Sequence, residues 1–121
     1  MAKIESHLDL IVWQKAMDLS VAVYGLTARF PPAENYRLTS QLTRAVVSVA
    51  ANIAEGHARS TAKDFANFLA IARGSLAETQ TFILLAVRLG YLTEAEVSTT
   101  LALVDEVGKM ISALRRRIAP R

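Results

Sequence analysis

The sequence predicts an all-α fold, an antiparallel up-down four-helix bundle. Apolar residues recur at steps of three and four along four segments, short polar or proline-containing stretches separate these segments, and no strand-like alternation occurs. The chain has 121 residues, the size of one domain, and its short connections favour antiparallel neighbours. We therefore expect residues 1–121 to form a single bundle with helices at about 10–28, 38–56, 62–89 and 94–118.

The first predicted helix carries one apolar face and ends before a proline pair. Pro31 and Pro32 follow it, and proline both lacks an amide donor and disfavours helical geometry in the preceding residue. The apolar face consists of Trp13, Ala16, Leu19, Val23 and Leu26.

The second predicted helix has a heptad seam, because its apolar or small residues alternate at steps of four and three. Thr39 and Ser40 are the predicted N-cap residues, since their hydroxyls can accept hydrogen bonds from the free amides of a first turn. The seam consists of Leu38, Leu42, Ala45, Val49, Asn52 and Gly56.

Capping signals bound the third and fourth predicted helices. Thr61 and Asp64 have the spacing of a capping-box variant at the start of the third. Gly90 is expected to form a left-handed C-cap at its end. Thr93 and Glu96 then give a full T-x-x-E capping box, which starts the fourth helix.

The second and third helices carry more apolar surface than one bundle face requires. An ordinary bundle helix keeps roughly three of seven positions apolar, whereas residues 82–85 read FILL and residues 45–53 read AVVSVAANI. Association with further copies of the chain would bury this surface. The alternative is that both helices are simply central in a monomer. We expect self-association.

Residue types exclude several classes of function. The chain has no Cys, which excludes disulfides, thiolate zinc sites and thiol catalysis and suits a reducing cytoplasm. His7 and His57 have no second ligand three or four residues further on, so no metal or other cofactor is predicted. Gly74 and Ser75 lie in no phosphate-loop or nucleophile-elbow pattern. No stretch has the roughly 20 apolar residues of a membrane span. We expect a cytoplasmic protein that is not an enzyme.

The basic residues are candidates for phosphate contact. The chain has 14 Lys and Arg against 11 Asp and Glu, and residues 108–121 contain five basic residues and no acid. Scattered cations are usually only solvated, but repetition around a symmetry axis would turn them into a ring that contacts nucleic acid. The predicted nucleic-acid contacts are Arg44, Arg59, Lys63, Arg73, Arg115, Arg116 and Arg117.

A polar network is predicted between the second and third helices. Asn52 and Glu55 lie on or beside the apolar seam, where a buried polar group needs a hydrogen-bond partner. We expect a structural network that fixes the register of the two helices; catalysis by Glu55 or Glu78 in a pocket is the alternative. The expected partners are Arg44, Arg73, Ser75 and Glu78.

Several stretches of the chain together resemble one known family. They read DLIVWQKAMDL, VYGLTARFP, ENYRLTSQLTRAVVSVAANIAEG, FANFLAIARGSLAET and RLGYL, and they cover about Leu8 to Leu92. In these residues the chain is similar to the bacterial four-helix bundle proteins encoded in intervening sequences of 23S ribosomal RNA genes.

The resemblance implies a protomer that assembles into a ring-shaped homopentamer. It also implies kinship with accessory proteins of diversity-generating retroelements, which bind nucleic acid and a reverse transcriptase, whereas the intervening-sequence proteins themselves have no established activity. The expected partners are therefore other copies of the chain, RNA or DNA, and a protein such as a reverse transcriptase. A protein-interaction or structural ring without nucleic-acid binding is the alternative. The arginine tail matches the family only in pattern.

Overall fold

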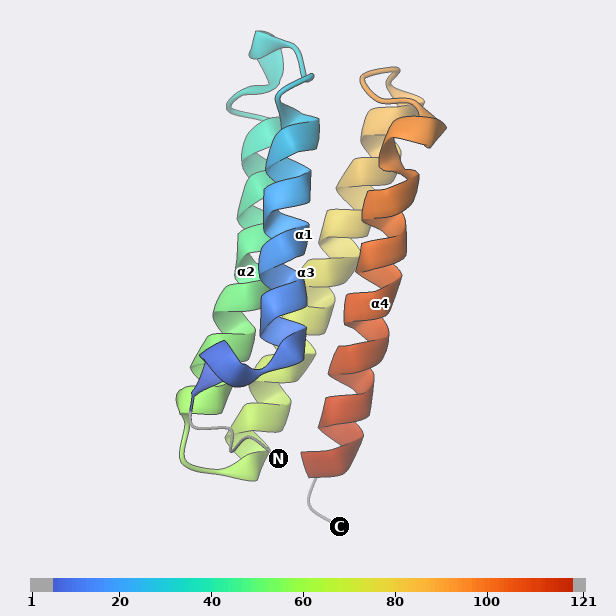
Figure 1. Ribbon diagram of the computed structural model, residues 1–121. Helices are drawn as coiled ribbons and strands as arrows, with labels where there is room; N and C mark the ends of the chain where they lie inside the picture. The colour runs from blue at the N-terminus through green and yellow to red at the C-terminus, as the bar shows by residue number, and fades with distance from the viewer. Residues whose placement is uncertain (1–5, 119–121) are drawn as a thin grey trace.

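The computed structural model describes residues 6–118, which fold into helices without a strand in that range (Figure 1). The predicted all-α fold with four long helices is confirmed. Two short 3₁₀ turns, η1 (His7–Asp9) and η2 (Pro32–Glu34), precede the first and second long helices. The long helices are α1 (Ile11–Thr27), α2 (Leu38–Ala58), α3 (Ala62–Arg88) and α4 (Glu94–Ile118).

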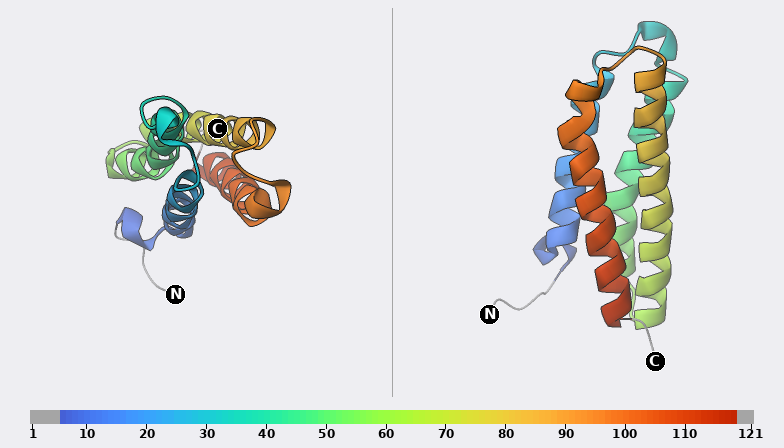
Figure 2. Two further views of the ribbon diagram at one scale, coloured as in Figure 1. Left: turned by 90° about the horizontal axis from the view of Figure 1, so that it is seen from above. Right: turned by 90° about the vertical axis from the view of Figure 1, so that its right-hand side faces the viewer.

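Each long helix packs against two others. α1 contacts α2 and α4, α3 contacts the same two helices, and α2 and α3 share the most extensive interface. Seen from above, the four helices surround a common centre (Figure 2). The α1–α2 and α3–α4 connections lie at one end of the bundle and the α2–α3 connection at the other (Figure 1).

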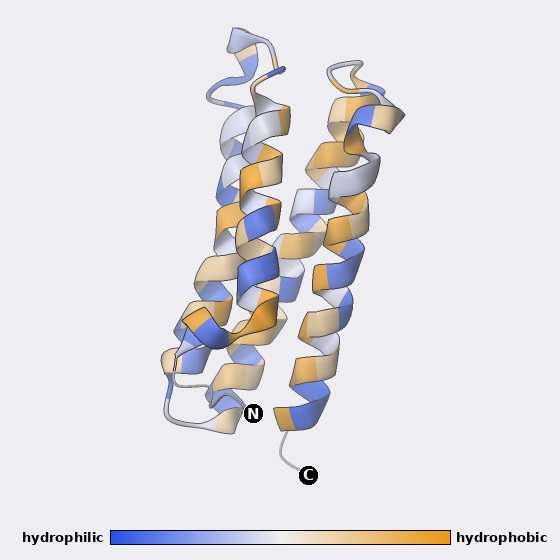
Figure 3. Cartoon of the chain, in the orientation of Figure 1, coloured by the Kyte–Doolittle hydropathy of each residue, from blue (hydrophilic) through white to orange (hydrophobic). Residues whose placement is uncertain are grey.

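The predicted apolar faces supply the core. Leu19 and Val23 of α1, Val49 of α2, Ile83 of α3 and Val107 of α4 are completely buried, and full burial of such a side chain contributes about 1.5–3 kcal/mol. Figure 3 shows hydrophobic segments along all four helices. In the described range, no helix is long and apolar enough to span a membrane.

The predicted N-cap of α2 is wrong. The cap position is Arg37, which makes no side-chain cap bond, and Thr39 and Ser40 lie inside the first turn. The hydroxyl of Thr39 is buried and has no hydrogen-bond partner among residues 6–118. The amide of Leu38 instead donates to Oε1 of Glu34 at 3.4 Å, because η2 brings this carboxylate to the start of α2.

The predicted caps at Thr61, Gly90 and Thr93 are confirmed, although the described residues show only one of the two capping-box bonds at Thr61. Thr61 Oγ1 accepts from the amide of Asp64 at 3.1 Å and starts α3. Gly90 has a φ of +80°, the left-handed C-cap in which glycine is favoured. Thr93 and Glu96 exchange both bonds of the capping box, at 2.8 and 3.2 Å.

Side-chain contacts join the α1–α2 connection to the α3–α4 connection, which lies at the same end of the bundle (Figure 1). The hydroxyl of Tyr91 donates to Oε2 of Glu34 at 2.7 Å, and the Tyr91 ring lies 5.6 Å from that of Phe30. Arg29, at the end of α1, forms an ion pair with Glu96 in the first turn of α4. The α1–α2 connection is thereby joined to the α3–α4 connection.

Near the opposite end, α2 approaches α3 so closely that only glycine fits. A Cβ atom on Gly56 would lie 2.7 Å from Cβ of Phe68 and 3.0 Å from Cδ1 of Phe65. The first of these atoms is fixed to the α3 backbone and cannot rotate away. Gly74 of α3, by contrast, has nothing within 4 Å of the position a Cβ would take.

Substitution of these two glycines by alanine is expected to change the free energy of unfolding in opposite directions. Gly56→Ala is expected to lower the free energy of unfolding by about 1–2 kcal/mol, because overpacking outweighs the higher helix propensity of alanine. Gly74→Ala is expected to raise it by about 0.5–1 kcal/mol, because only the propensity changes. Urea denaturation at one fixed protein concentration measures both, and shifts of the same sign would contradict the close contact at Gly56.

Glu96 predicts a loss of stability in acid. The backbone N–H of Thr93, with the charge of Arg29 assisting, lowers the pKa of Glu96 below its ordinary value of 4.5. A lowered folded-state pKa gives stability that is present above pH 4.5 and is lost as pH falls through the folded pKa. Glu96→Gln should therefore be less stable than the parent at pH 6, and the difference should shrink at pH 3. Urea denaturation at both pH values tests this; an unchanged difference would contradict it.

Candidate functional site

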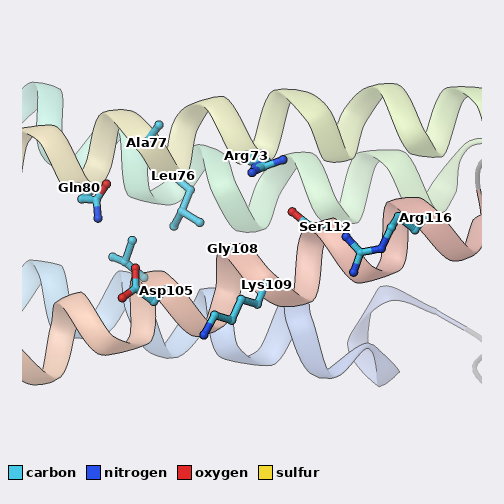
Figure 4. A pocket seen from close by; sticks show the side chains of 10 residues that line it. Arg73, Leu76, Ala77, Gln80, Asp105, Gly108, Lys109, Ser112 and Arg116 are labelled. Atoms are coloured by element: carbon cyan, nitrogen blue, oxygen red, sulfur yellow. The ribbon is translucent and has the colours of Figure 1, made fainter.

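A groove of about 390 Å³ runs between α3 and α4 (Figure 4). Each helix lines it with residues at steps of three and four, which lie on one helix face. We call this surface the α3–α4 groove. Its walls are Arg73, Ala77 and Gln80 from α3 and Asp105, Lys109, Ser112 and Arg116 from α4.

Small and buried apolar residues shape the floor of the groove. Leu76 and Val104 are almost completely buried and line it from below. A Cβ on Gly108 would lie 3.4 Å from Cδ2 of Leu76, so any larger residue there would fill the floor. Glycine at 108 and alanine at 77 therefore keep the groove open.

The cationic side chains gather towards one end of the groove. A second hollow of about 370 Å³ shares Arg73, Ser112 and Arg116 with the groove and adds Arg115. Figure 4 shows Arg73 across the groove from Ser112 and Arg116. Together the two hollows bring four cations against a single carboxylate, that of Asp105.

Arg115 carries a donor with no acceptor. Its Nε atom is shielded from solvent and makes no hydrogen bond within the described part of the chain. A buried donor without a partner costs about 1–3 kcal/mol. The terminal nitrogens of the same guanidinium can donate to an anionic oxygen from a ligand, which would also neutralise neighbouring charge.

The structure thus brings together three of the seven predicted nucleic-acid contacts, namely Arg73, Arg115 and Arg116. Arg44 lines a separate hollow between α2 and α3. Arg117 lines another, beside residues at the start of α1. Arg121, which adds to the positive charge of the tail, lies outside the described residues.

The two remaining predicted contacts lie at the α2–α3 connection. Arg59 is already engaged, because it pairs with Glu55 at 3.2 Å and its guanidinium lies 4.9 Å from the centre of the Phe68 ring. Lys63 is exposed in the first turn of α3. This connection and the end of α4 lie at the same end of the bundle (Figure 1), so the cations there add to the positive potential near the groove.

Four polar residues of the groove were not among the predicted contacts, namely Gln80, Asp105, Lys109 and Ser112. A sequence signal for three of them exists: Asp105, Lys109, Ser112 and Arg116 are spaced at i, i+4, i+7 and i+11, one polar face of α4. That signal does not reveal which helix faces this side of α4. Only the packing of α3 beside it makes the face a groove.

Comparison with known proteins identifies the family. The sequence model of the 23S rRNA-intervening sequence proteins matches residues 8–113. The chain belongs to this family. The match extends past Leu92, further than the resemblance seen in the sequence, and it includes Arg73, Lys109 and Ser112. Arg115 and Arg116 lie beyond the matched range.

A solved structure has the same fold as this family member. It is a protein of unknown function from the S23 ribosomal protein family of Bacteroides thetaiotaomicron VPI-5482, with a TM-score of 0.80 and 24% sequence identity. The alignment covers 87% of this chain and 98% of the other. A search of curated proteins gives no match.

In this family member, serines form the polar link between α2 and α3. Nδ2 of Asn52 donates to both the carbonyl and the hydroxyl oxygen of Ser48, each at 2.8 Å. The hydroxyl of Ser48 lies 2.9 Å from that of Ser75 on α3. Asn52 and Ser75 are therefore joined through Ser48, which the sequence analysis did not identify.

The charged members expected in this network have other positions. Glu55 is exposed and pairs with Arg59 on its own helix. Glu78 is exposed and shares a hollow of about 230 Å³ with Arg44, but no ion pair joins these two described residues. Arg73 faces α4, so the expectation that it would serve Asn52 or Glu55 is wrong. The side chains turn outward because water solvates a charge better than the interface does.

Apolar side chains are exposed on several helices. On α1, Val21 is 73% exposed and Ile11 61%. On α3, Ile71 and Leu85 are about half exposed and lie on one face, which Leu89 continues just after the helix; Leu84 of α3 and Val47 of α2 are also about half exposed. Ile83, in the apolar run of α3, is instead completely buried. The apolar excess expected from the sequence is thus partly core and partly surface, and α1 adds surface that its sequence pattern did not indicate.

Proposed function

We propose that this chain is a non-enzymatic, oligomeric nucleic-acid-binding protein that contacts RNA or DNA phosphates through the α3–α4 groove. One observation carries the proposal: Arg73, Arg115, Arg116 and Lys109 converge on one surface against a single carboxylate. Neutralising phosphates releases counterions, and this supplies most of non-specific affinity.

The main competing explanation for these cations is that they stabilise the C-terminal end of α4 and bind no ligand. Cations in the last turn of a helix stabilise it through the helix dipole, and Arg115 and Arg116 belong to the last turn of α4. Arg73 and Lys109 lie well before the ends of their helices, so the dipole does not account for them. A test of the proposal therefore uses Arg73, whose removal leaves both helix ends unchanged.

The first test is binding of RNA and DNA with its salt dependence. Affinity should fall roughly 20-fold or more between 50 and 200 mM salt if three or four phosphates are contacted. Arg73→Gln should weaken binding and reduce the slope of log affinity against log salt by about 1 per subunit. Fluorescence anisotropy with labelled oligonucleotides measures both.

Arg88→Gln is the matched control, because it removes the same charge from the same helix about 22 Å further along. It should change binding much less than Arg73→Gln. Equal effects of the two variants would assign binding to overall charge rather than to the groove. No binding of RNA or DNA at about 50 mM salt would reject the proposal.

We also propose that the protomer, an antiparallel up-down bundle in the cytoplasm, assembles with copies of itself into a ring, with a pentamer as the expected size. Exposed apolar residues on α1 and α3 support self-association, because burying them contributes about 25 cal/mol per Å². A ring that binds only another protein, such as a reverse transcriptase, is the second candidate function. The exposed apolar residues on α1 and α3 support it, because such residues can also contact a different protein.

Sedimentation velocity at micromolar concentration tests assembly. The parent chain should sediment as an oligomer, and Leu85→Glu should shift it towards monomer, because a charge cannot be buried there without a partner. Thr99→Glu, at an exposed position of α4 away from these apolar residues, is the control and should leave the oligomer intact. A parent chain that sediments as a monomer would contradict assembly.

A further inference from the structure

The width of the α3–α4 groove restricts what can enter it. Packed helices lie about 8–10 Å apart axis to axis, so the space between their side chains is narrower still. The major groove of duplex DNA alone is about 12 Å wide, and a duplex would touch only the rim. A single strand is thin enough to lie along the floor formed by Leu76, Val104 and Gly108.

The polarity of the groove changes along its length. Arg73 and Arg116 line one part and Gln80 and Asp105 line the other, with Lys109 between them, one helical turn from Asp105 (Figure 4). At 1.5 Å per residue, Asp105 is about 16 Å along α4 from Arg116. A row of duplex phosphates that continued past the arginines would meet the carboxylate, which repels it.

The part lined by Gln80 and Asp105 suits a base rather than a phosphate. A carboxylate accepts hydrogen bonds from an exocyclic amino group, and an amide side chain both donates and accepts. The edges of bases are free for such contacts in single strands, where the bases can be splayed out. Asp105 is exposed and forms no ion pair with another described residue, so it is available to accept from a base.

We propose that the α3–α4 groove binds a single-stranded nucleic acid, with its phosphates on Arg73, Arg115 and Arg116 and a base edge on Gln80 and Asp105. The inference rests on the proposed nucleic-acid binding and specifies the form of nucleic acid that is bound. RNA and DNA strands share this chemistry, and only the 2′-hydroxyl distinguishes them.

The first experiment compares strands with duplexes. Binding of the full chain to a labelled oligonucleotide is measured by fluorescence anisotropy at about 100 mM salt. One mixed sequence is used as RNA and as DNA, and each is tested as a single strand and as a duplex with its complement. The single strands should bind at least about tenfold more tightly than the duplexes. Equal or tighter duplex binding would overturn the single-strand inference and leave the proposed function standing. Absence of binding to every probe would instead reject the proposed function.

The second experiment tests the base contact. Cytosine offers an amino donor where uracil has a carbonyl acceptor, so the parent chain should bind an oligocytidine about fivefold or more tightly than an oligouridine. Asp105→Asn should reduce this ratio, whereas Arg73→Gln should weaken both probes alike. A parent chain without this preference, or a ratio unchanged in Asp105→Asn, would overturn the base assignment.

Glu106→Gln is the control for Asp105→Asn. Glu106 is the neighbouring acid, but it pairs with Lys15 of α1 at 3.3 Å and so points away from the groove. Its substitution removes the same charge and should preserve the preference for cytidine. Thermal melts followed by circular dichroism establish that each variant is folded before its binding is compared.

Discussion

The packing of α2 against α3 is the constraint on which the rest of this structure depends. The two helices share the most extensive interface of the bundle, and Gly56 allows their backbones to approach where any side chain would meet Phe68. This contact fixes the rotation of α3. One face of α3 is committed to α2 and another to the core, so Arg73, Ala77 and Gln80 are left to line the boundary with α4.

The α3–α4 groove exists because this rotation of α3 turns Arg73, Ala77 and Gln80 towards α4 and because small residues line it. Alanine at 77 and glycine at 108 leave space that larger side chains would fill, and in the described part of the chain the cations at its edge form no ion pair with an acid. Arg59, in contrast, is paired with Glu55 on its own helix. A cation without a protein partner remains free to bind an anion, which is why the groove, rather than the number of basic residues, suggests a function.

Most of the exposed apolar surface of this protomer lies away from the cations of the groove. Ile11 and Val21 lie on α1, and Ile71 and Leu85 lie on a face of α3 distinct from that of Arg73, whereas the half-exposed Leu84 shares the face of Arg73. Self-association through apolar residues and phosphate binding through the groove are therefore compatible. In a symmetric assembly each subunit would present its own groove, and weak contacts to one strand would add.

Local sequence patterns predict the helices and the nature of their faces, because period, caps and prolines act over a few residues. Leu19, Leu42 and Val49 could be placed in the core from spacing, and the caps at Thr61, Gly90 and Thr93 from local hydrogen-bond chemistry. Helix packing, in contrast, sets which cations meet, how Asn52 is linked through Ser48 to Ser75, and that Glu34 caps α2. Each of these depends on which helix faces which, and that choice is made by the summed packing of distant segments, which no local pattern contains.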